Sequence, residues 1–167
     1  MADYAFVTHW HIAAPVKRVW DAIYDFKRWP SWWRGVVSVV ETKPGDAQGI
    51  GGEGIYTWRS VLPYTLMFTV RTVRVEPHAA LGAVVAGDLE GTGLWRFEAE
   101  PGGTHVRYDW NVRTTQRWIQ RLEPVARPLF IWNHDVIMHW GEIGLRRLLQ
   151  GTGPGGMDYR PRSSVLR

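Results

Sequence analysis

The spacing of hydrophobic and polar positions changes twice along this chain, which divides it into an opening segment, a strand-rich middle and a helical end. Residues 4–12 alternate loosely and are rich in aromatic and β-branched side chains, which predicts a strand. Between residues 16 and 24 hydrophobic side chains recur every three or four positions, which predicts an amphipathic helix with Pro15 in its first turn. Because Pro30 cannot continue that helix, residues 29–33 are expected to form a second, short one.

The middle of the chain has the two-residue period of β-strands. It is clearest where Val106, Tyr108, Trp110 and Val112 alternate with polar or charged residues. In an earlier strand the alternation slips by one position, and a β-bulge near residues 71–73 would absorb the slip. Six strands are expected in this part, over residues 36–41, 55–61, 64–75, 81–89, 93–100 and 106–113.

Two connections in this middle part are rich in glycine. The first, residues 45–54, is expected to be an irregular loop and is a candidate lid over a ligand cavity. The second is expected at residues 88–93, between the fourth and fifth of the six strands.

The last part of the hydrophobic pattern predicts a long helix, which Thr114 or Thr115 could cap at its N-terminus. Pro124 and Pro128 are expected to kink or restart it, and residues 129–150 contain no proline. At 3.6 residues per turn, one face of this helix carries Phe130, Ile137, Gly141, Gly144 and Leu148, with Asn133 and His134 pointing the same way. The two glycines each cost about 1 kcal/mol of helix propensity, which a close approach of helix and sheet would offset.

The order of elements predicts an α+β fold, because strands bounded by helices differ from the alternation of βαβ units. Six antiparallel strands with one polar face must bury the other, and the long helix is the element available to cover it. We expect one domain over residues 1–150, followed by a flexible tail at residues 151–167 that is rich in Gly, Pro and Arg.

The high aromatic content suggests that the expected fold contains a ligand cavity. The 167 residues include eleven Trp, six Tyr and five Phe, more than a small core needs, and a Trp-rich cavity suits a flat, apolar or aromatic ligand. The absence of Cys excludes disulfides, thiolate catalysis and Cys-ligated metals.

Charge and hydropathy restrict the classes of binding partner and the cellular location that we expect for this protein. The net charge of +4 comes from basic residues spread along the chain, which favours solvated strand faces over nucleic-acid binding. The first residues do not have the pattern of a signal peptide, and no apolar stretch approaches the ~18 residues of a membrane span. A cytoplasmic protein is the expectation.

The motifs, in this order, resemble those of the SRPBCC superfamily, the START-like proteins with a helix-grip fold, and in particular its polyketide cyclase/dehydrase-like branch. The resemblance covers about residues 3–150. It rests on APVKRVW at residues 14–20, WPSWW at 29–33, GDLEGTG at 87–93, WRF at 95–97, GTHVRY at 103–108 and the final helix.

The resemblance implies a curved seven-stranded antiparallel sheet wrapped around the long C-terminal helix, with two short helices after the first strand and an apolar cavity inside. The superfamily includes lipid and hormone carriers, aromatase/cyclases, oxygenase subunits and chaperone co-activators, and it has no universal catalytic residue. The oxygenase branch has an iron-binding His/His/carboxylate set, for which this chain has no suitable helical His pair. We therefore expect no metal or nucleotide cofactor.

Strand alternation and the helix face together identify the residues expected to contact a small hydrophobic or aromatic ligand. The polar ones, Asn133 and His134, either hydrogen-bond other core groups such as Tyr108 or recognise a ligand carbonyl or hydroxyl. His9 and His11 share a strand face and could chelate a metal, but no third ligand is evident. The expected ligand contacts are Tyr56, Trp58, Phe68, Trp95, Tyr108, Trp110, Asn133, His134 and Ile137.

Three functions remain open at this point. The leading hypothesis is binding, in transport or sequestration, of a small hydrophobic or aromatic molecule. The alternative is a cyclase or dehydratase that uses His134 or Tyr108 as acid or base. A third is a protein-interaction module, which predicts a poorly formed cavity and an exposed apolar patch.

Overall fold

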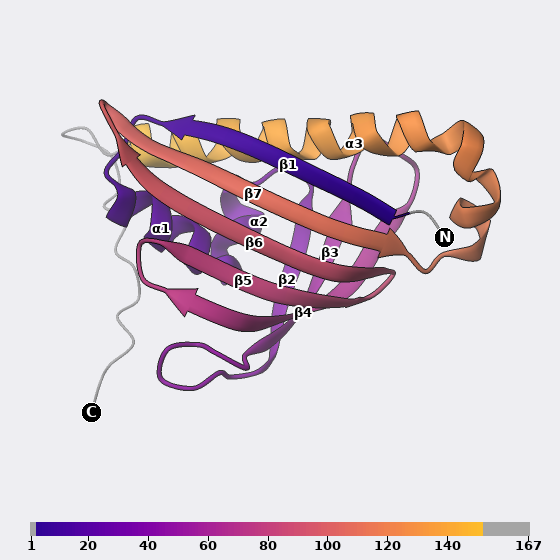
Figure 1. Ribbon diagram of the computed structural model, residues 1–167, viewed down its shortest axis with the longest axis horizontal. Helices are drawn as coiled ribbons and strands as arrows, with labels where there is room; N and C mark the ends of the chain where they lie inside the picture. Colours follow the sequence, from indigo (N-terminus) through magenta and orange to yellow (C-terminus); the bar gives the residue numbers. More distant parts are fainter. Residues whose placement is uncertain (1–2, 152–167) are drawn as a thin grey trace.

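A seven-stranded antiparallel sheet forms most of the molecule. The computed structural model describes residues 3–151, without the side chains of residues 123 and 124. The order of strands across the sheet is β1-β7-β6-β5-β4-β3-β2, so the first strand joins the last and the others follow their chain order. The strands are β1 (Asp3–Ile12), β2 (Val36–Lys43), β3 (Glu53–Arg59), β4 (Thr65–Glu76), β5 (Ala80–Gly87), β6 (Leu89–Glu100) and β7 (Gly103–Thr114) (Figure 1).

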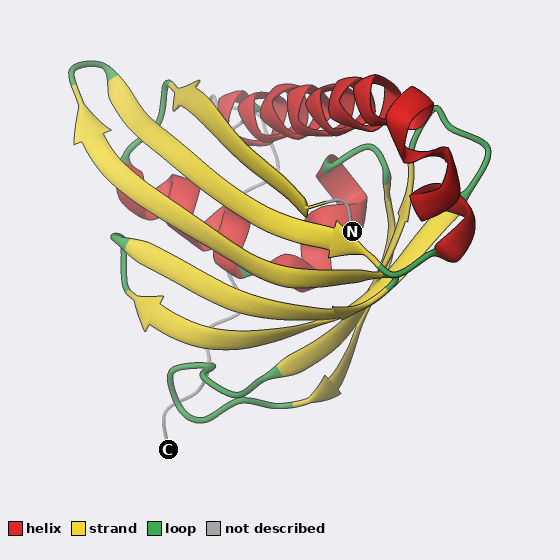
Figure 2. Ribbon diagram, turned by 45° about the vertical axis from the view of Figure 1, so that its right-hand side comes forward, coloured by secondary structure: helices red, strands yellow, loops and turns green. Residues whose placement is uncertain are grey.

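The helices lie on the concave side of this curved sheet. Helix α1 (Val16–Tyr24), a single 3₁₀ turn η1 (Phe26–Arg28) and the short α2 (Trp29–Trp32) follow β1, and α3 (Arg117–Gln150) follows β7. The sheet curls around the inner side of α3, with α1 and α2 below it (Figure 2). The predicted α+β helix-grip fold, with its seven strands, two short helices and long final helix, is confirmed.

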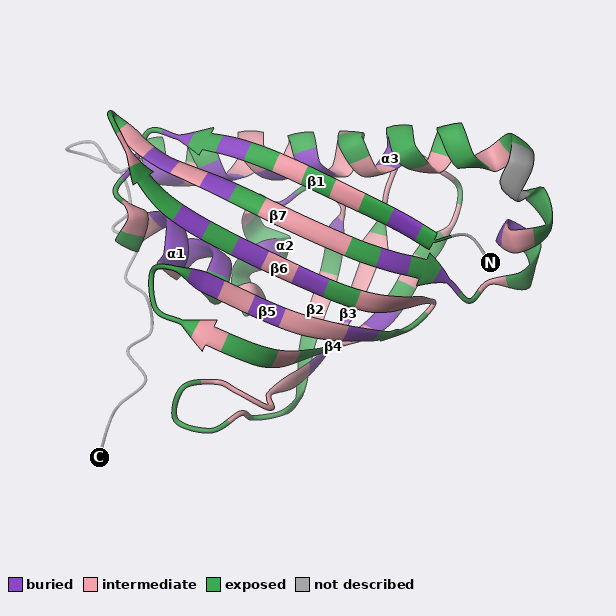
Figure 3. Cartoon of the chain, in the orientation of Figure 1, coloured by how far each residue is buried: buried purple, intermediate pink, exposed green. Residues whose placement is uncertain are grey.

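Strand alternation places aromatic side chains inside the curved sheet and charged ones outside. Along β6 and β7 buried and exposed residues succeed one another, as the bands in Figure 3 show. The predicted β-bulge is also present, since the pairing of β4 with β5 shifts register between Thr72 and Arg74. Such a bulge bends the strand locally.

The predicted connection at residues 88–93 is wrong, because β6 begins at Leu89 and only Asp88 separates it from β5. The glycines there serve close packing instead of a loop. Gly91 has φ +151° and pairs with Val112, and a Cβ atom on Gly91 would lie 2.0 Å from the carbonyl oxygen of Asn111.

Helix α3 is continuous past both of its prolines, but its axis bends between its first turns and the long straight segment that follows (Figures 1 and 2). Capping by Thr114 or Thr115 is wrong, because the N-cap is Gln116 and no side chain caps it. The Thr114 hydroxyl accepts a hydrogen bond from the backbone N–H of Gln116 at 3.2 Å, and Thr115 donates to the carbonyl of Gly87 at 2.7 Å.

The two glycines of α3 permit a close approach to α2 and the residue after it, not to the sheet. A Cβ atom on Gly144 would lie 1.9 Å from the carbonyl oxygen of Trp32, and one on Gly141 would lie 2.5 Å from the Trp33 ring. Trp33 also donates a hydrogen bond from Nε1 to the carbonyl of Ile137 at 2.9 Å. The expectation of a close helix–sheet contact is therefore corrected to a helix–helix contact.

Tryptophans fill the closed end of the core. The rings of Trp10 and Trp33 are 5.4 Å apart, those of Trp10 and Trp95 are also 5.4 Å apart, and Trp33 meets Trp58 edge to face at 5.1 Å. Trp29 donates a hydrogen bond from Nε1 to the carbonyl of Ile23 at 3.0 Å. This packed end holds α2 and α3 against the sheet and leaves space beyond it, toward the N-terminal turns of α3.

Candidate ligand-binding site

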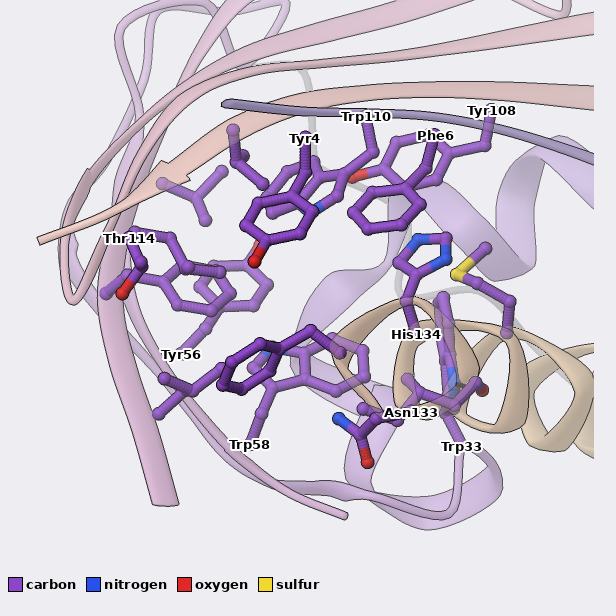
Figure 4. Close-up of a pocket in the computed structure, with 18 of the residues that line it drawn as sticks. Tyr4, Phe6, Trp33, Tyr56, Trp58, Tyr108, Trp110, Thr114, Asn133 and His134 are labelled. Atoms are coloured by element: carbon purple, nitrogen blue, oxygen red, sulfur yellow. Dashed lines mark hydrogen bonds between the residues drawn. The ribbon is translucent and has the colours of Figure 1, made fainter. Parts of the chain in front are cut away.

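A cavity of about 160 Å³ lies between the concave face of the sheet and α3. Its walls are almost entirely aromatic and aliphatic side chains, many of which are drawn in Figure 4. The polar groups in the lining are tyrosine hydroxyls, the Trp indole N–H groups, Thr114, Asn133 and His134. Within the described residues, no Lys, Arg, Asp or Glu lines this cavity.

All nine residues that the sequence pointed to lie in this lining, although whether they bind a ligand stays a prediction. They come from four strands and the last helix, because period-2 alternation and the inner face of α3 direct them to the same space. The strands contribute Tyr56 and Trp58 from β3, Phe68 from β4, Trp95 from β6, and Tyr108 and Trp110 from β7, and α3 contributes Asn133, His134 and Ile137.

The floor of the cavity is a stack of rings on β6 and β7. Trp95 pairs with Tyr108 in the strand register, and their rings stack with centroids 3.8 Å apart. Tyr108 in turn lies 5.6 Å from Trp110. Gly93 makes room for them, since a Cβ atom there would lie 2.8 Å from the Tyr108 hydroxyl and 2.9 Å from the Trp110 ring. Trp95 and Tyr108 thus cover one face of each other, and only their remaining surfaces are available to a bound molecule.

Sequence reasoning missed several lining residues. Tyr4 and Phe6 of β1 line the cavity, and their alternation along the strand was a usable signal. Tyr64 was expected to begin a strand over residues 64–75, in phase with Phe68, but it lies in the connection between β3 and β4. Its ring meets Trp118 at 5.5 Å and Phe130 at 6.1 Å, so it joins this connection to α3 at the far end of the cavity.

The interpretation of residues 45–54 as a lid is wrong. The lining includes none of the residues between β2 and β3. This loop is held elsewhere: Tyr24 of α1 donates a hydrogen bond to the carbonyl of Gln48 at 3.0 Å, and the backbone N–H of Gly51 donates to the carbonyl of Thr72 at 2.8 Å.

The hydroxyls of Tyr56, Tyr64 and Tyr108 stay protonated. Burial, and to a smaller extent Tyr56, raises the pKa of Tyr108 well above its ordinary value. Burial likewise raises the pKa of Tyr56, and burial together with Tyr4 raises the pKa of Tyr64 to about 12. These groups can therefore donate or accept hydrogen bonds, and Tyr108 is a weaker acid than an exposed tyrosine.

His134 is uncharged at neutral pH. Burial lowers its pKa to about 4, an effect that Asp135 partly offsets. The Asp135 carboxylate is 3.6 Å from Nδ1 of His134, too long for a hydrogen bond but close enough to act electrostatically. The imidazole stacks on Phe6, with ring centroids 3.8 Å apart and planes 11° from parallel (Figure 4).

Three polar groups of the lining are buried without a hydrogen-bond partner in the described part of the chain. They are the Trp58 indole N–H, the Asn133 side-chain carbonyl and both ring nitrogens of His134. The alternative that Asn133 and His134 hydrogen-bond Tyr108 or another core group is therefore not what the structure shows. Buried polar groups are paired in the great majority of native proteins, so an unpaired group at a cavity indicates a role outside the fold itself.

The histidine pair of β1 lies on the outer face of the sheet, away from the cavity. His9 Nδ1 is 2.8 Å from Nε2 of His105 on β7, and His11 Nδ1 is 2.9 Å from the Glu100 carboxylate. Across residues 3–151 no three His, Cys, Asp or Glu groups are placed to hold a metal ion. Nor does any helix in this range have both the length and the hydropathy needed to cross a membrane.

Comparison with known proteins gives a family and a set of similar folds. A family model described as polyketide cyclase / dehydrase and lipid transport matches residues 5–136. A search of curated proteins found no match.

Solved structures with the same fold share little sequence with this chain. The di-domain ARO/CYC protein BexL superposes with a TM-score of 0.72 at 18% identity over 90% of this chain, which spans about half (51%) of that protein. A protein from Thermus thermophilus superposes with a TM-score of 0.69 at 16% identity, covering 85% of this chain and 97% of the other. A START superfamily protein from Mycobacterium smegmatis gives 0.68 at 10% identity, covering 89% and 97%.

Proposed function

We propose that this chain, which belongs to the polyketide cyclase / dehydrase and lipid transport family, binds a small hydrophobic or aromatic molecule between its sheet and α3. One observation carries the proposal, namely an apolar cavity of about 160 Å³ with aromatic side chains on several sides. For comparison, an engineered apolar cavity of roughly 150 Å³ stays dry and binds benzene. Burial of apolar surface and ring stacking would supply the binding free energy.

Replacing Trp110 with Ala tests whether the cavity wall serves binding. Trp110 lines the cavity and is only partly buried by its neighbours. We expect Trp110→Ala to weaken binding of naphthalene at least about tenfold, measured by equilibrium dialysis, because it removes contact area from a bound ring. The free energy of unfolding should fall by less than the about 3–5 kcal/mol typical of a packed Trp→Ala change.

Phe97→Ala is the matched control. Phe97 is 4% exposed and does not line the cavity, so this variant should lose more stability while its folded fraction keeps its affinity for naphthalene within about twofold. The opposite pattern, in which Trp110→Ala is as destabilising as Phe97→Ala and binding is unchanged, would make Trp110 an ordinary core residue.

A cyclase or dehydratase is the second candidate, and His134 is the observation that favours it. A neutral imidazole with two unpaired nitrogens faces the same space as the protonated Tyr108 hydroxyl, so a proton acceptor and a proton donor both lie beside a bound polyketide-like substrate. Burial makes the imidazole a weak base, with its pKa lowered to about 4, and the phenol a weak acid, with its pKa raised, so a bound substrate would have to shift both pKa values toward neutrality for efficient catalysis. Such an enzyme should lose its turnover in His134→Ala and show a pH–rate profile that depends on His134. Full activity in that variant would exclude this mechanism.

The interaction-module alternative has partial support. Its prediction of a poorly formed cavity does not fit the cavity of about 160 Å³ between the sheet and α3. Its prediction of exposed apolar side chains fits the outer face of α3, where Trp118, Leu122, Val125, Leu129 and Trp132 are each at least 45% exposed. The proposal of ligand binding rests on the cavity, which an interaction module does not need.

A further inference from the structure

If the proposed binding function holds, the cavity itself restricts the chemical class of the ligand. Its polar groups, the lack of charged side chains among its described lining residues and its size each contribute to this restriction. Three side chains present unsatisfied hydrogen-bonding atoms: the Trp58 indole can only donate, the Asn133 amide can donate and accept, and the neutral His134 ring has one donor and one acceptor nitrogen. Asn133 is 5% exposed, and Figure 4 shows its amide and the His134 ring projecting from α3 in different directions, at two places in the lining of the cavity.

A purely hydrocarbon ligand would leave these atoms as they are, buried and unpaired. Each such group costs free energy until it finds a partner, so a ligand that pairs with them gains affinity that a hydrocarbon of the same shape does not. A hydroxyl group fits this set best, because one O–H can donate to the Asn133 carbonyl or to a His134 nitrogen and can also accept from the Trp58 N–H.

The cavity excludes a charged ligand. None of the described lining residues is Lys, Arg, Asp or Glu, and the one histidine is neutral at physiological pH. A carboxylate or ammonium group would lose its hydration without meeting a counter-ion, which is far more costly than burying a hydroxyl.

Size and shape restrict the ligand further. A space of about 160 Å³ is close to one that holds a single benzene ring, and it accommodates one or two fused rings. The many aromatic side chains of the lining favour a flat molecule.

We infer that the cavity selects an uncharged, flat aromatic molecule of one or two rings that carries a phenol-type hydroxyl, and that Asn133, Trp58 and His134 recognise the hydroxyl. The same side chains thus distinguish phenols from hydrocarbons of equal size and from the corresponding carboxylates.

Three probes of matched ring size test this selectivity: naphthalene, 2-naphthol and 2-naphthoate. Equilibrium dialysis of the full chain at pH 7.5 should show 2-naphthol bound at least about tenfold more tightly than naphthalene. The carboxylate should bind at least about tenfold more weakly than 2-naphthol.

Asn133→Leu connects the selectivity to the unpaired amide. In this variant the preference for 2-naphthol over naphthalene should fall below about threefold, with naphthalene binding retained. Because an unpaired buried polar group is replaced by an apolar one of similar size, the thermal unfolding midpoint should be kept or raised. Trp58→Phe should also reduce the preference and serves if Asn133→Leu fails to fold. Asn111→Leu, on the exposed face of β7, and Trp132→Phe, on the exposed face of α3, are the matched controls and should keep the preference.

Two results would overturn the inference while leaving the proposed function intact: equal affinity for naphthalene and 2-naphthol, or tight binding of 2-naphthoate. An unchanged preference in both Asn133→Leu and Trp58→Phe would remove these residues from the recognition of the hydroxyl. If none of the three probes binds, the proposed binding function itself fails.

Discussion

His134 is the residue whose surroundings most alter its chemistry. It lies between Phe6 and the cavity, and burial lowers its pKa to about 4 although Asp135 is nearby. In the unfolded chain the same imidazole has an ordinary pKa of about 6.5. Between these two values the unfolded protein binds a proton that the folded protein does not, so acidification through this range favours unfolding.

The dependence of the protein's stability on acid pH should therefore come in part from His134. We expect the free energy of unfolding of the wild-type protein to fall between pH 7.5 and pH 4.5, with about 2–3 kcal/mol of the fall arising from His134. A His134→Phe variant keeps a flat ring against Phe6 and cannot be protonated, so its loss over the same range should be smaller by that amount. Urea denaturation of both proteins at the two pH values measures the difference, and equal losses would contradict the burial of a neutral imidazole.

Individual cavity residues were predictable only in part. Alternation along β3, β4, β6 and β7 was sufficient to place Tyr56, Trp58, Phe68 and the rings of the floor, because a strand has only two faces. It could not show that Asn133 and His134 lack partners, since pairing depends on which atoms of distant elements come within hydrogen-bonding distance. Tyr64 was overlooked although the strand expected over residues 64–75 put it in phase with Phe68, and the structure leaves it in the connection before β4.

At the scale of elements, sequence patterns predicted some features of α3 but not its packing partner. The period of 3.6 residues was sufficient to identify its inner face. It also indicated that the two glycines of the helix lie at a close contact. It did not identify the partner of those glycines, because the sequence does not say how α2 is oriented over α3. The structure places the Trp32 carbonyl and the Trp33 ring against them.

Gly144→Ala tests this helix–helix contact. The added methyl group would gain about 1 kcal/mol of helix propensity, but it would lie 1.9 Å from the Trp32 carbonyl oxygen and force α2 and α3 apart. We expect a net loss of about 1–3 kcal/mol in the free energy of unfolding, measured by chemical denaturation. Gln150→Ala, at the exposed end of α3, should change it by less than about 0.5 kcal/mol. A stabilised Gly144→Ala protein would contradict the close approach.

At the scale of the whole molecule, the order of elements and the motifs that resemble the SRPBCC superfamily were sufficient for the fold. The errors lay at the junctions, such as the start of β6 at Leu89, where glycines needed for close packing looked like a loop. The division into a domain over residues 1–150 and a flexible tail stays a prediction, because residues 152–167 lie outside those described. The volume of the cavity could not be predicted either, since it depends on how far the tryptophans of the closed end fill the space under the sheet.

The account depends most on the claim that this cavity holds one small, uncharged aromatic molecule. Native mass spectrometry of the full chain tests it most directly, on the protein as purified and after incubation with 2-naphthol. The account predicts one added small-molecule mass per chain, lost on denaturation and reduced in Trp110→Ala. A spectrum of the bare chain alone, before and after incubation, or equal binding by wild type and Trp110→Ala, would contradict it.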